Sequence, residues 1–260
     1  MAFLRPVPGT NINVSALGLG TVKIGRDQGV KYPQSFTIPD DNQVKNLLAH
    51  ASESGINLID TAPAYGNSEE RLGKLIQNRK DWVIATKTGE EFSKGKSYFD
   101  FSAQHTRHSI ERSLNLLQTD YLDIVLIHSG GNDLDILERT DCISTLRACQ
   151  KEGKIRAIGM STKTIEGGIK AASMLDIVMI TYNLEQQDQD VINIAQENNK
   201  GVFVKKGLMS GHADSVRESM ELLFRNTGNH SSNGIHSVIV GTINPDHLAQ
   251  NIALAKELID

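Results

Sequence analysis

The sequence alternates short apolar segments with longer amphipathic ones, and this pattern limits the possible folds more than any other feature of the chain. Strand-length apolar runs that are separated by segments of helical period are typical of repeated βαβ units in a parallel sheet. The predicted strands are residues 16–20, 57–60, 82–87, 122–128, 155–159, 177–181, 202–205 and 238–241. About eight strands with intervening helices favour a closed (β/α)8 TIM barrel of the α/β class over a doubly wound sheet.

The length of the chain fits one such barrel. Because 260 residues with 39% hydrophobic side chains can bury a large core, we expect a single barrel domain over residues 1–260. Turn-forming residues at 7–11 predict a small N-terminal hairpin that closes the bottom of the barrel. Asp40 or Asp41 is expected to cap the helix that follows it, and the polar segment 226–233 is expected to form a loop.

Charge and cysteine content exclude several classes of partner. The formal net charge is −4 and there is no basic run, which argues against nucleic acid and against a membrane surface. No apolar run reaches the length needed to span a bilayer. The spacing of Cys142 and Cys149 matches neither a redox pair nor a zinc site, so we expect two buried thiols and no metal. The expected protein is cytoplasmic and soluble, and is a monomer or a small homo-oligomer.

Four ionisable side chains lie at or just after the ends of predicted strands. Asp60 ends the second strand, and Tyr65 follows it in the next loop. Lys87 ends the third strand, and His128 ends the fourth. The carboxyl ends of the strands in a parallel eight-stranded barrel converge on one rim, where catalytic groups are found. We therefore expect these four side chains to meet in one site.

Together these four groups suit a reaction that develops negative charge on an oxygen atom. A tyrosine hydroxyl is a neutral proton donor, but its ordinary pKa of about 10 makes it a slow one. An ammonium at Lys87 is expected to lower the pKa of Tyr65, and Asp60 is expected to keep that lysine charged and in place. His128 can then orient the oxygen through a hydrogen bond. Each residue alone has an ordinary structural explanation, so the argument depends on their combination.

Three segments carry a resemblance to a known family. Residues 57–66, Asn-Leu-Ile-Asp-Thr-Ala-Pro-Ala-Tyr-Gly, resemble the first signature of the aldo-keto reductases, in which the Asp and the Tyr are catalytic. Residues 85–87 resemble the strand that carries the family's catalytic lysine, and residues 120–128 resemble the strand that carries its histidine. The resemblance covers nearly the whole chain. It implies a nicotinamide-dependent oxidoreductase that reduces aldehydes or ketones to alcohols, with Tyr65 as proton donor.

The same resemblance implies contacts with the cofactor. Residues 159–162, Gly-Met-Ser-Thr, are similar to the family's Gly-Val-Ser-Asn segment, whose Ser and Asn bind the nicotinamide amide. Met179 stands where relatives often have a glutamine that binds this amide, and Lys205 stands where they commonly have an aromatic residue that stacks on the ring. The cofactor-binding residues implied are Gly20, Thr21, Ser161, Thr162, Lys205, Lys206, Gly207, Leu208, Gly241, Thr242 and Asn251.

The identity of the cofactor stays open between two forms. NADPH is the default of the family, and residues 238–251 resemble its adenosine-phosphate site. The Lys or Arg with which relatives hold the 2′-phosphate is missing around Ile243 and His247, so NADH stays possible unless a partly protonated His247 takes that place.

Two other functions remain as alternatives. The first is a cofactor-binding regulatory or redox-sensing barrel subunit with little turnover. The second is an unrelated barrel enzyme that acts on a phosphorylated sugar, in which the Asp60 and Tyr65 signature has no purpose.

The aromatic-rich loop 89–101 is a candidate wall of the substrate site, although simple packing explains its composition equally well. The sequence leaves the physiological substrate and direction of reaction open.

Overall fold

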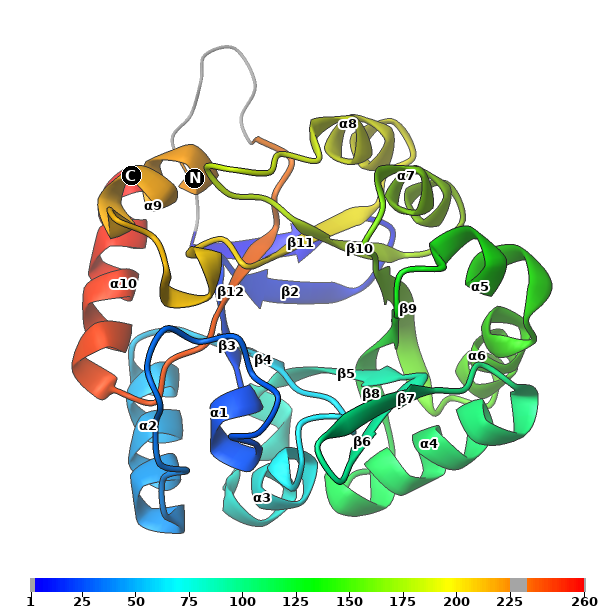
Figure 1. Cartoon of the computed structure of the whole chain (residues 1–260), viewed down its shortest axis with the longest axis horizontal. Coiled ribbons are helices and arrows are strands. Elements are labelled where there is room, and N and C mark those ends of the chain that lie inside the picture. Colours follow the sequence, from blue (N-terminus) through cyan, green and yellow to red (C-terminus); the bar gives the residue numbers. More distant parts are fainter. Residues whose placement is uncertain (1–2, 225–232, 260) are drawn as a thin grey trace.

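A closed barrel of eight parallel strands forms the centre of the molecule (Figure 1), in a computed structural model that describes residues 3–224 and 233–259. The strands pair in the order β10, β11, β12, β3, β4, β5, β8 and β9, and β9 pairs with β10 to close the barrel. Their bounds are β3 Leu17–Gly20, β4 Leu58–Asp60, β5 Val83–Thr88, β8 Leu122–His128, β9 Ile155–Ser161, β10 Ile177–Thr181, β11 Gly201–Lys205 and β12 Ser237–Val240. Each overlaps one of the eight predicted strands, so the predicted (β/α)8 barrel is confirmed.

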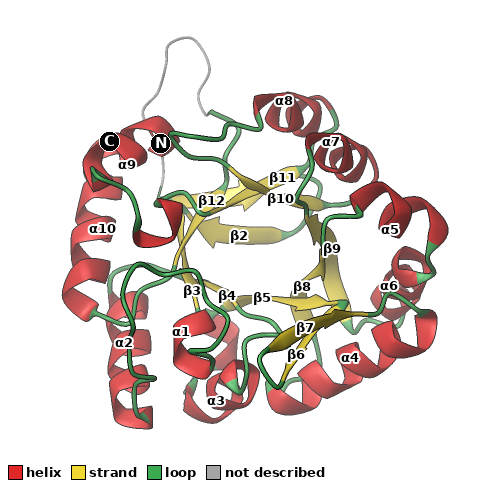
Figure 2. Ribbon diagram, in the orientation of Figure 1, coloured by secondary structure: helices red, strands yellow, loops and turns green. Residues whose placement is uncertain are grey.

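Helices surround the barrel on its outside (Figure 2). Their bounds are α1 Val22–Gly25, α2 Asp41–Glu53, α3 Ser68–Leu75, α4 Ala103–Leu116, α5 Asp133–Arg139, α6 Cys142–Lys151, α7 Ile165–Met174, α8 Gln189–Glu197, α9 Val216–Phe224 and α10 Pro245–Ile259, with short 3-10 turns η1 Arg79–Asp81 and η2 Met209–Gly211. Asp40 caps α2, because its carboxylate accepts a hydrogen bond from the backbone N–H of Gln43 at 2.8 Å. The Gln43 side chain accepts one from the Asp40 N–H at 2.9 Å in return, which completes a capping box.

The predicted N-terminal hairpin is confirmed. It consists of the antiparallel strands β1 (Leu4–Val7) and β2 (Ile12–Ser15). The side chains of Val7, Ile12 and Val14 are buried and belong to the same apolar cluster as the side chains inside the barrel, such as Phe203. A Cβ atom at Gly201, the first residue of β11, would lie 2.6 Å from Val7, so the hairpin packs closely against the amino-terminal ends of the strands and closes the bottom.

Two apolar clusters account for the core. The larger one lies between the barrel and its helices, and it includes both cysteines, which are buried and unpaired with each other. The smaller one fills the lower barrel interior with side chains such as Leu58 and Ile124. Strands that are buried on both faces have nearly continuous apolar sequences, and for this reason their positions could be predicted from the sequence. In the described part of the chain, no helix combines the length and apolar character needed to cross a membrane.

Two predicted loops have different outcomes. Residues 89–101 were expected to form a loop, but they contain a second hairpin of β6 (Glu90–Ser93) and β7 (Lys96–Phe99). Its turn residues Lys94 and Gly95 both have positive φ, 51° and 77°, which matches the twist of a two-residue hairpin. The other predicted loop, 226–233, lies outside the described residues except for Asn233.

Candidate functional site

The carboxyl ends of the barrel strands surround a cavity of about 910 Å³. Each strand of the barrel contributes to its wall, because all eight run in the same direction and end on one rim. These strand residues are Gly20, Asp60, Lys87, His128, Ser161, Met179, Lys205 and Val240. The volume lies in the range of small-molecule and cofactor sites, and all four residues that were predicted to be catalytic line this cavity.

Asp60 and Lys87 form a buried ion pair on neighbouring strands. Lys87 Nζ donates to Asp60 Oδ1 at 2.5 Å and to the backbone carbonyl of Thr61 at 2.8 Å. The register of β4 and β5 places Asp60 opposite Ala85, two residues before Lys87, so both side chains enter the cavity from one side of the barrel. Burial lowers the pKa of Lys87, and the adjacent Asp60 opposes this change.

The loop that carries Tyr65 is fixed by two glycines. Gly66 has a φ of +64°, and a Cβ there would collide with the carbonyl oxygen of Gly25. A Cβ at Gly25 would in turn collide with the carbonyl oxygen of Tyr65. Arg26 adds a hydrogen bond from its guanidinium to the Ala64 carbonyl at 2.8 Å. The close packing of this loop on α1 therefore holds Tyr65 at the cavity wall.

The expected lowering of the pKa of Tyr65 is contradicted by the structure. Its hydroxyl faces Asp60 Oδ2 at 3.4 Å, whereas Lys87 Nζ lies over the ring, 4.6 Å from its centroid. Burial and the negative charge of Asp60 raise the pKa of Tyr65 well above its ordinary value. The prediction failed because Lys87 directs its hydrogen bonds to Asp60 and Thr61 rather than to the phenol oxygen. In this arrangement Tyr65 keeps its proton.

His128 lies beside Tyr65 and contacts a glutamate that no sequence motif marks. The two rings are 6.1 Å apart in an edge-to-face arrangement. His128 Nδ1 lies 2.9 Å from Glu90 Oε2, on the first residue of β6. Burial lowers the pKa of His128, and the contact with Glu90 opposes this effect.

Eight of the eleven residues predicted to contact a cofactor line the cavity, where a bound cofactor could reach them. They are Gly20, Ser161, Lys205, Lys206, Leu208, Gly241, Thr242 and Asn251. The other three residues, Thr21, Thr162 and Gly207, do not line it. Thr21 is buried, and its hydroxyl donates to the Asp60 carbonyl at 2.9 Å and accepts from Ser68 at 2.8 Å. Thr162 is buried as well, and Gly207 packs under the rim.

Lys205 reaches past β10 to the end of β9. Its Nζ donates to Ser161 Oγ at 2.8 Å and to the carbonyl of Thr162 at 2.5 Å. Burial together with the nearby ammonium groups of Lys206 and Lys163 lowers the pKa of Lys205 to about 7. Lys205 is therefore a cation that can lose its charge near neutral pH.

The cavity carries a positive charge although the chain as a whole is acidic. Five lysines and one carboxylate are found among the described residues of its wall, while the formal net charge of the chain is −4. The lysines are Lys23, Lys87, Lys163, Lys205 and Lys206, and the carboxylate is Asp60. Walls of low dielectric strengthen such a local field, which favours the binding of an anionic ligand such as a pyrophosphate.

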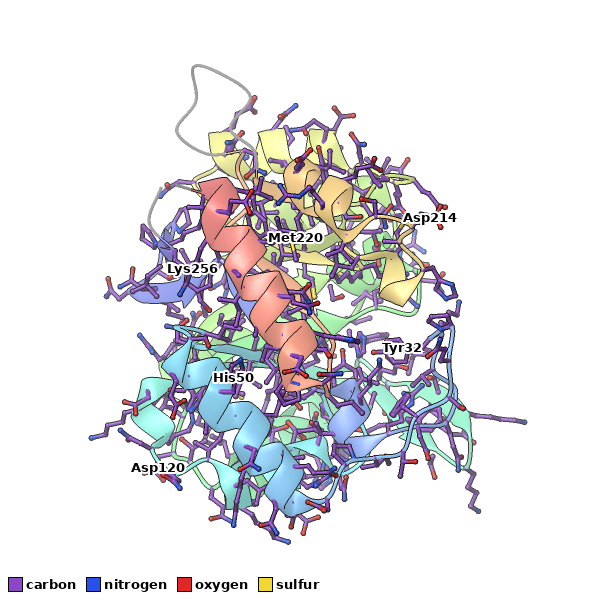
Figure 3. The ribbon with its side chains drawn as sticks, turned by 90° about the vertical axis from the view of Figure 1, so that its left-hand side faces the viewer. Tyr32, His50, Asp120, Asp214, Met220 and Lys256 are labelled. Carbon is purple, nitrogen blue, oxygen red and sulfur yellow. The ribbon has the colours of Figure 1, made fainter. Side chains whose placement is uncertain are left out.

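Several wall residues had no clear signal in the sequence. Tyr32, labelled in Figure 3, extends from the segment between α1 and α2 toward the start of α10, and its hydroxyl lies 3.3 Å from the position of a Cβ at Gly241. Lys23 Nζ lies 4.0 Å from the centroid of the Tyr32 ring. Lys163 and Gln186 also line the cavity. Only Lys163 had a usable signal, because it lies two residues after the end of β9.

The aromatic residues of 89–101 do not line this cavity. Phe92 stacks on the Arg26 guanidinium, 3.5 Å from the ring centroid. Tyr98 and Phe99 are exposed, and Phe101 packs against the larger apolar cluster. Their described contacts therefore favour packing and rim positions over a wall of this cavity.

Comparisons with known proteins identify the family of this chain. The family model described as "Aldo/keto reductase family" matches residues 16–234. The oxidoreductase YqkF of Bacillus subtilis, itself uncharacterized, is 29% identical over 84% of this chain and 70% of its own length. The aldo-keto reductase YhdN of the same organism is 33% identical over 73% of this chain and 57% of its own length.

A solved structure is similar over nearly the full length of both chains. The Pseudomonas aeruginosa protein PA4992, provisionally named an aldo-keto reductase, is 51% identical, with a TM-score of 0.89 over 99% of this chain and 95% of that one. The alignment with the family model, the barrel and the oxidoreductase relatives lead to one conclusion. The chain belongs to the aldo/keto reductase family and is an oxidoreductase.

Proposed function

We propose that this protein reduces aldehydes or ketones to alcohols with a nicotinamide cofactor, and that Tyr65 donates the proton. The observation that carries the proposal is the grouping of four side chains on one cavity wall. Lys87 pairs with Asp60 at 2.5 Å, the Tyr65 hydroxyl faces Asp60 at 3.4 Å, and the Tyr65 and His128 rings are 6.1 Å apart. A proton donor, a cation and a polar side chain beside one space suit the stabilisation of a developing alkoxide.

The residues of the cavity fit a dinucleotide. The volume of about 910 Å³ and the five wall lysines suit a large ligand with a negatively charged pyrophosphate. Ser161 and Gln186 supply hydrogen-bonding groups near the ends of β9 and β10 for an amide, and Lys205 and Lys206 supply charge. Thr242, which precedes α10, and Asn251, in the second turn of α10, supply polar groups for the adenosine end. When bound, the reduced cofactor supplies the hydride.

The chain's own residues handle the proton. Burial and Asp60 raise the pKa of Tyr65, so its hydroxyl is protonated when a carbonyl arrives. The Tyr65 O–H bond breaks and the O–H bond of the alcohol forms as the carbonyl oxygen gains charge. Lys87 Nζ, 4.6 Å from the ring centroid, stabilises the phenolate that is left until solvent returns a proton. His128, whose ring lies 6.1 Å from the Tyr65 ring, orients the carbonyl oxygen.

NADPH is the form we assign to the cofactor, with NADH as the alternative. The support for NADPH is the positive wall and the exposed His247 in the first turn of α10, where the helix dipole favours an anion. Asp246 in the same turn works against a 2′-phosphate, which supports the NADH alternative.

The test is a titration of the purified protein with NADPH and with NADH, followed by fluorescence, and then an oxidation assay with a panel of small aldehydes. Saturable binding with carbonyl-dependent oxidation is expected, and the ratio of the two affinities assigns the cofactor. Tight binding without turnover favours a regulatory or redox-sensing subunit. If neither cofactor binds, the proposal is wrong.

A further inference from the structure

Glu90 is brought next to His128, behind the cavity wall, by a sharp turn after β5. The preceding Gly89 has a φ of +102°, and a Cβ there would collide with the ring of Phe101. Only glycine adopts this conformation without strain in so little space. The chain therefore reverses at Gly89, and the first side chain of β6 faces His128 at the end of β8.

The carboxylate of Glu90 is ionised and held in place. Its side chain is 13% exposed, and Ser97 on the paired strand β7 donates to its Oε1 at 2.6 Å. Burial raises the pKa of this carboxyl, but contacts with His128, Ser97 and Arg26 outweigh burial and bring it to about 2. At neutral pH, His128 therefore faces a negative charge.

A negative charge at this distance determines which ring nitrogen of His128 carries a proton. Nδ1 lies 2.9 Å from Glu90 Oε2, although in this ring orientation it makes no hydrogen bond. A lone pair on Nδ1 would be repelled by the carboxylate, so Nδ1 is protonated. Neutral His128 then has a lone pair on Nε2, the nitrogen on the other edge of the ring. Only the imidazolium form can donate a hydrogen bond from Nε2.

We propose that Glu90 is a positioning residue that keeps the Nδ1 proton on His128, so that His128 donates to the substrate carbonyl from Nε2 as the imidazolium. This inference rests on the proposed carbonyl reduction. The charged groups that face His128 come from three elements: Glu90 on β6 favours the imidazolium, while Lys87 on β5 and Lys205 on β11 disfavour it. The carboxylate of Glu90 is the group that compensates for these two lysines.

The proposal gives His128 a pH-dependent role. Reduction is expected to speed up as the pH falls through the pKa of His128, because the fraction of imidazolium increases. Removing the charge of Glu90 lowers that pKa by about one unit or more, as is typical when a neighbouring opposite charge is lost. Above both pKa values the imidazolium fraction then falls about tenfold.

The first test is independent of activity. NMR of ¹⁵N-histidine-labelled protein reports the tautomer and the pKa of His128, whose signals are identified by their loss in His128→Gln. The expected result is Nδ1 protonation in the wild type, and a pKa at least about one unit lower in Glu90→Gln. Glu91→Gln is the matched control, because Glu91 neighbours Glu90 but pairs with Arg112 at 2.5 Å. An unchanged pKa and tautomer in Glu90→Gln would overturn the proposal.

The second test is the pH profile of kcat/KM for an aldehyde. In Glu90→Gln, the limb that rises toward low pH is expected to move down by about one unit, with about a tenfold loss at pH 7 carried by kcat more than by KM. Glu90→Asp, which keeps the carboxylate, is expected to retain more of the rate than Glu90→Gln. The control Glu91→Gln is expected to show no loss of rate. A uniform loss at every pH would indicate a merely structural role. If the wild type lacks turnover while the NMR shift is present, the proposed function fails and the pairing of Glu90 with His128 stands.

Discussion

Replacing Asp60 by asparagine tests the central charge pair of the cavity. In this variant Lys87 loses the carboxylate oxygen to which Nζ donates at 2.5 Å, and only 1% of its side chain is exposed to solvent. Breaking a buried pair costs about 3–5 kcal/mol, because one charge is left without compensation. The hydrogen bond from Nζ to the Thr61 carbonyl at 2.8 Å remains and offsets part of this cost.

Deprotonation of Lys87 sets an upper limit on the loss of stability. With a pKa of about 10.4 in the unfolded chain, a lysine requires about 4.6 kcal/mol to lose its proton at pH 7, since each pKa unit corresponds to about 1.36 kcal/mol. At pH 9 the same limit is about 1.9 kcal/mol. We therefore expect Asp60→Asn to lower the free energy of unfolding by about 3 kcal/mol at pH 7 and by less than about 2 kcal/mol at pH 9.

The direction of this pH dependence follows from the protons bound in each state. In the wild type, burial lowers the pKa of Lys87 and Asp60 opposes the change. Without Asp60, the folded-state pKa falls further below the unfolded value. The unfolded variant then binds more protons than the folded one between these two pKa values, so the stability of the variant increases as the pH rises.

Urea unfolding followed by circular dichroism at pH 7, 8 and 9 measures these differences. The double variant Asp60→Asn with Lys87→Met is expected to be more stable than Asp60→Asn alone, because it removes the uncompensated charge. Asp120→Asn, at an exposed position, is the control and is expected to change stability by less than about 0.5 kcal/mol. Equal losses at pH 7 and pH 9, or no recovery in the double variant, would refute the reasoning.

Three further substitutions test the proton donor, its loop and the charge of the cavity. Tyr65→Phe is expected to lower kcat/KM for aldehydes by a factor of about 10²–10⁴. Cofactor binding, measured by fluorescence, is expected to be retained. Activity equal to that of a Tyr121→Phe control would exclude Tyr65 as the proton donor. Gly66→Ala is expected to lower the unfolding free energy in urea by about 3 kcal/mol, because φ is +64° and a Cβ would collide with Gly25; a loss below about 1 kcal/mol would contradict this account. The pKa of Lys205 is about 7, so NADPH binding is expected to weaken as the pH rises from 6 to 8. Lys205→Met is expected to remove that dependence in the same fluorescence titration, and an unchanged profile would show that another group causes it.

The barrel was predictable from the sequence because its strands are buried on both faces. Their apolar runs are therefore nearly continuous and stand out from the amphipathic helices. The hairpin of β6 and β7 was missed because it lacks this property: β7 is exposed along its whole length. Its turn also uses Lys94 and Gly95 rather than the common Asn-Gly pair, so neither periodicity nor turn chemistry marked it.

The candidate site was predictable only where a residue's place on a strand determined its position. Asp60, Lys87 and His128 lie at the carboxyl ends of neighbouring strands of the barrel, so topology alone brings them together. Glu90 reaches His128 through a hairpin that was not predicted. The wrong expectation for the pKa of Tyr65 has a different origin, because it depends on where the ammonium group of Lys87 points, and no sequence pattern contains that direction.

Some charged groups of the cavity are balanced by a carboxylate of the protein, whereas Lys205 is not. Lys87 has Asp60 at 2.5 Å, and His128 has Glu90 at 2.9 Å. The hydrogen-bond partners of Lys205 are a hydroxyl and a carbonyl, neither of which carries a charge. Asp133 favours the charged form of this lysine, but its Oδ2 accepts hydrogen bonds from the start of α7. We therefore expect an anionic ligand to supply the compensation that Lys205 lacks, and its binding to bring the pKa of Lys205 back toward that of an ordinary lysine.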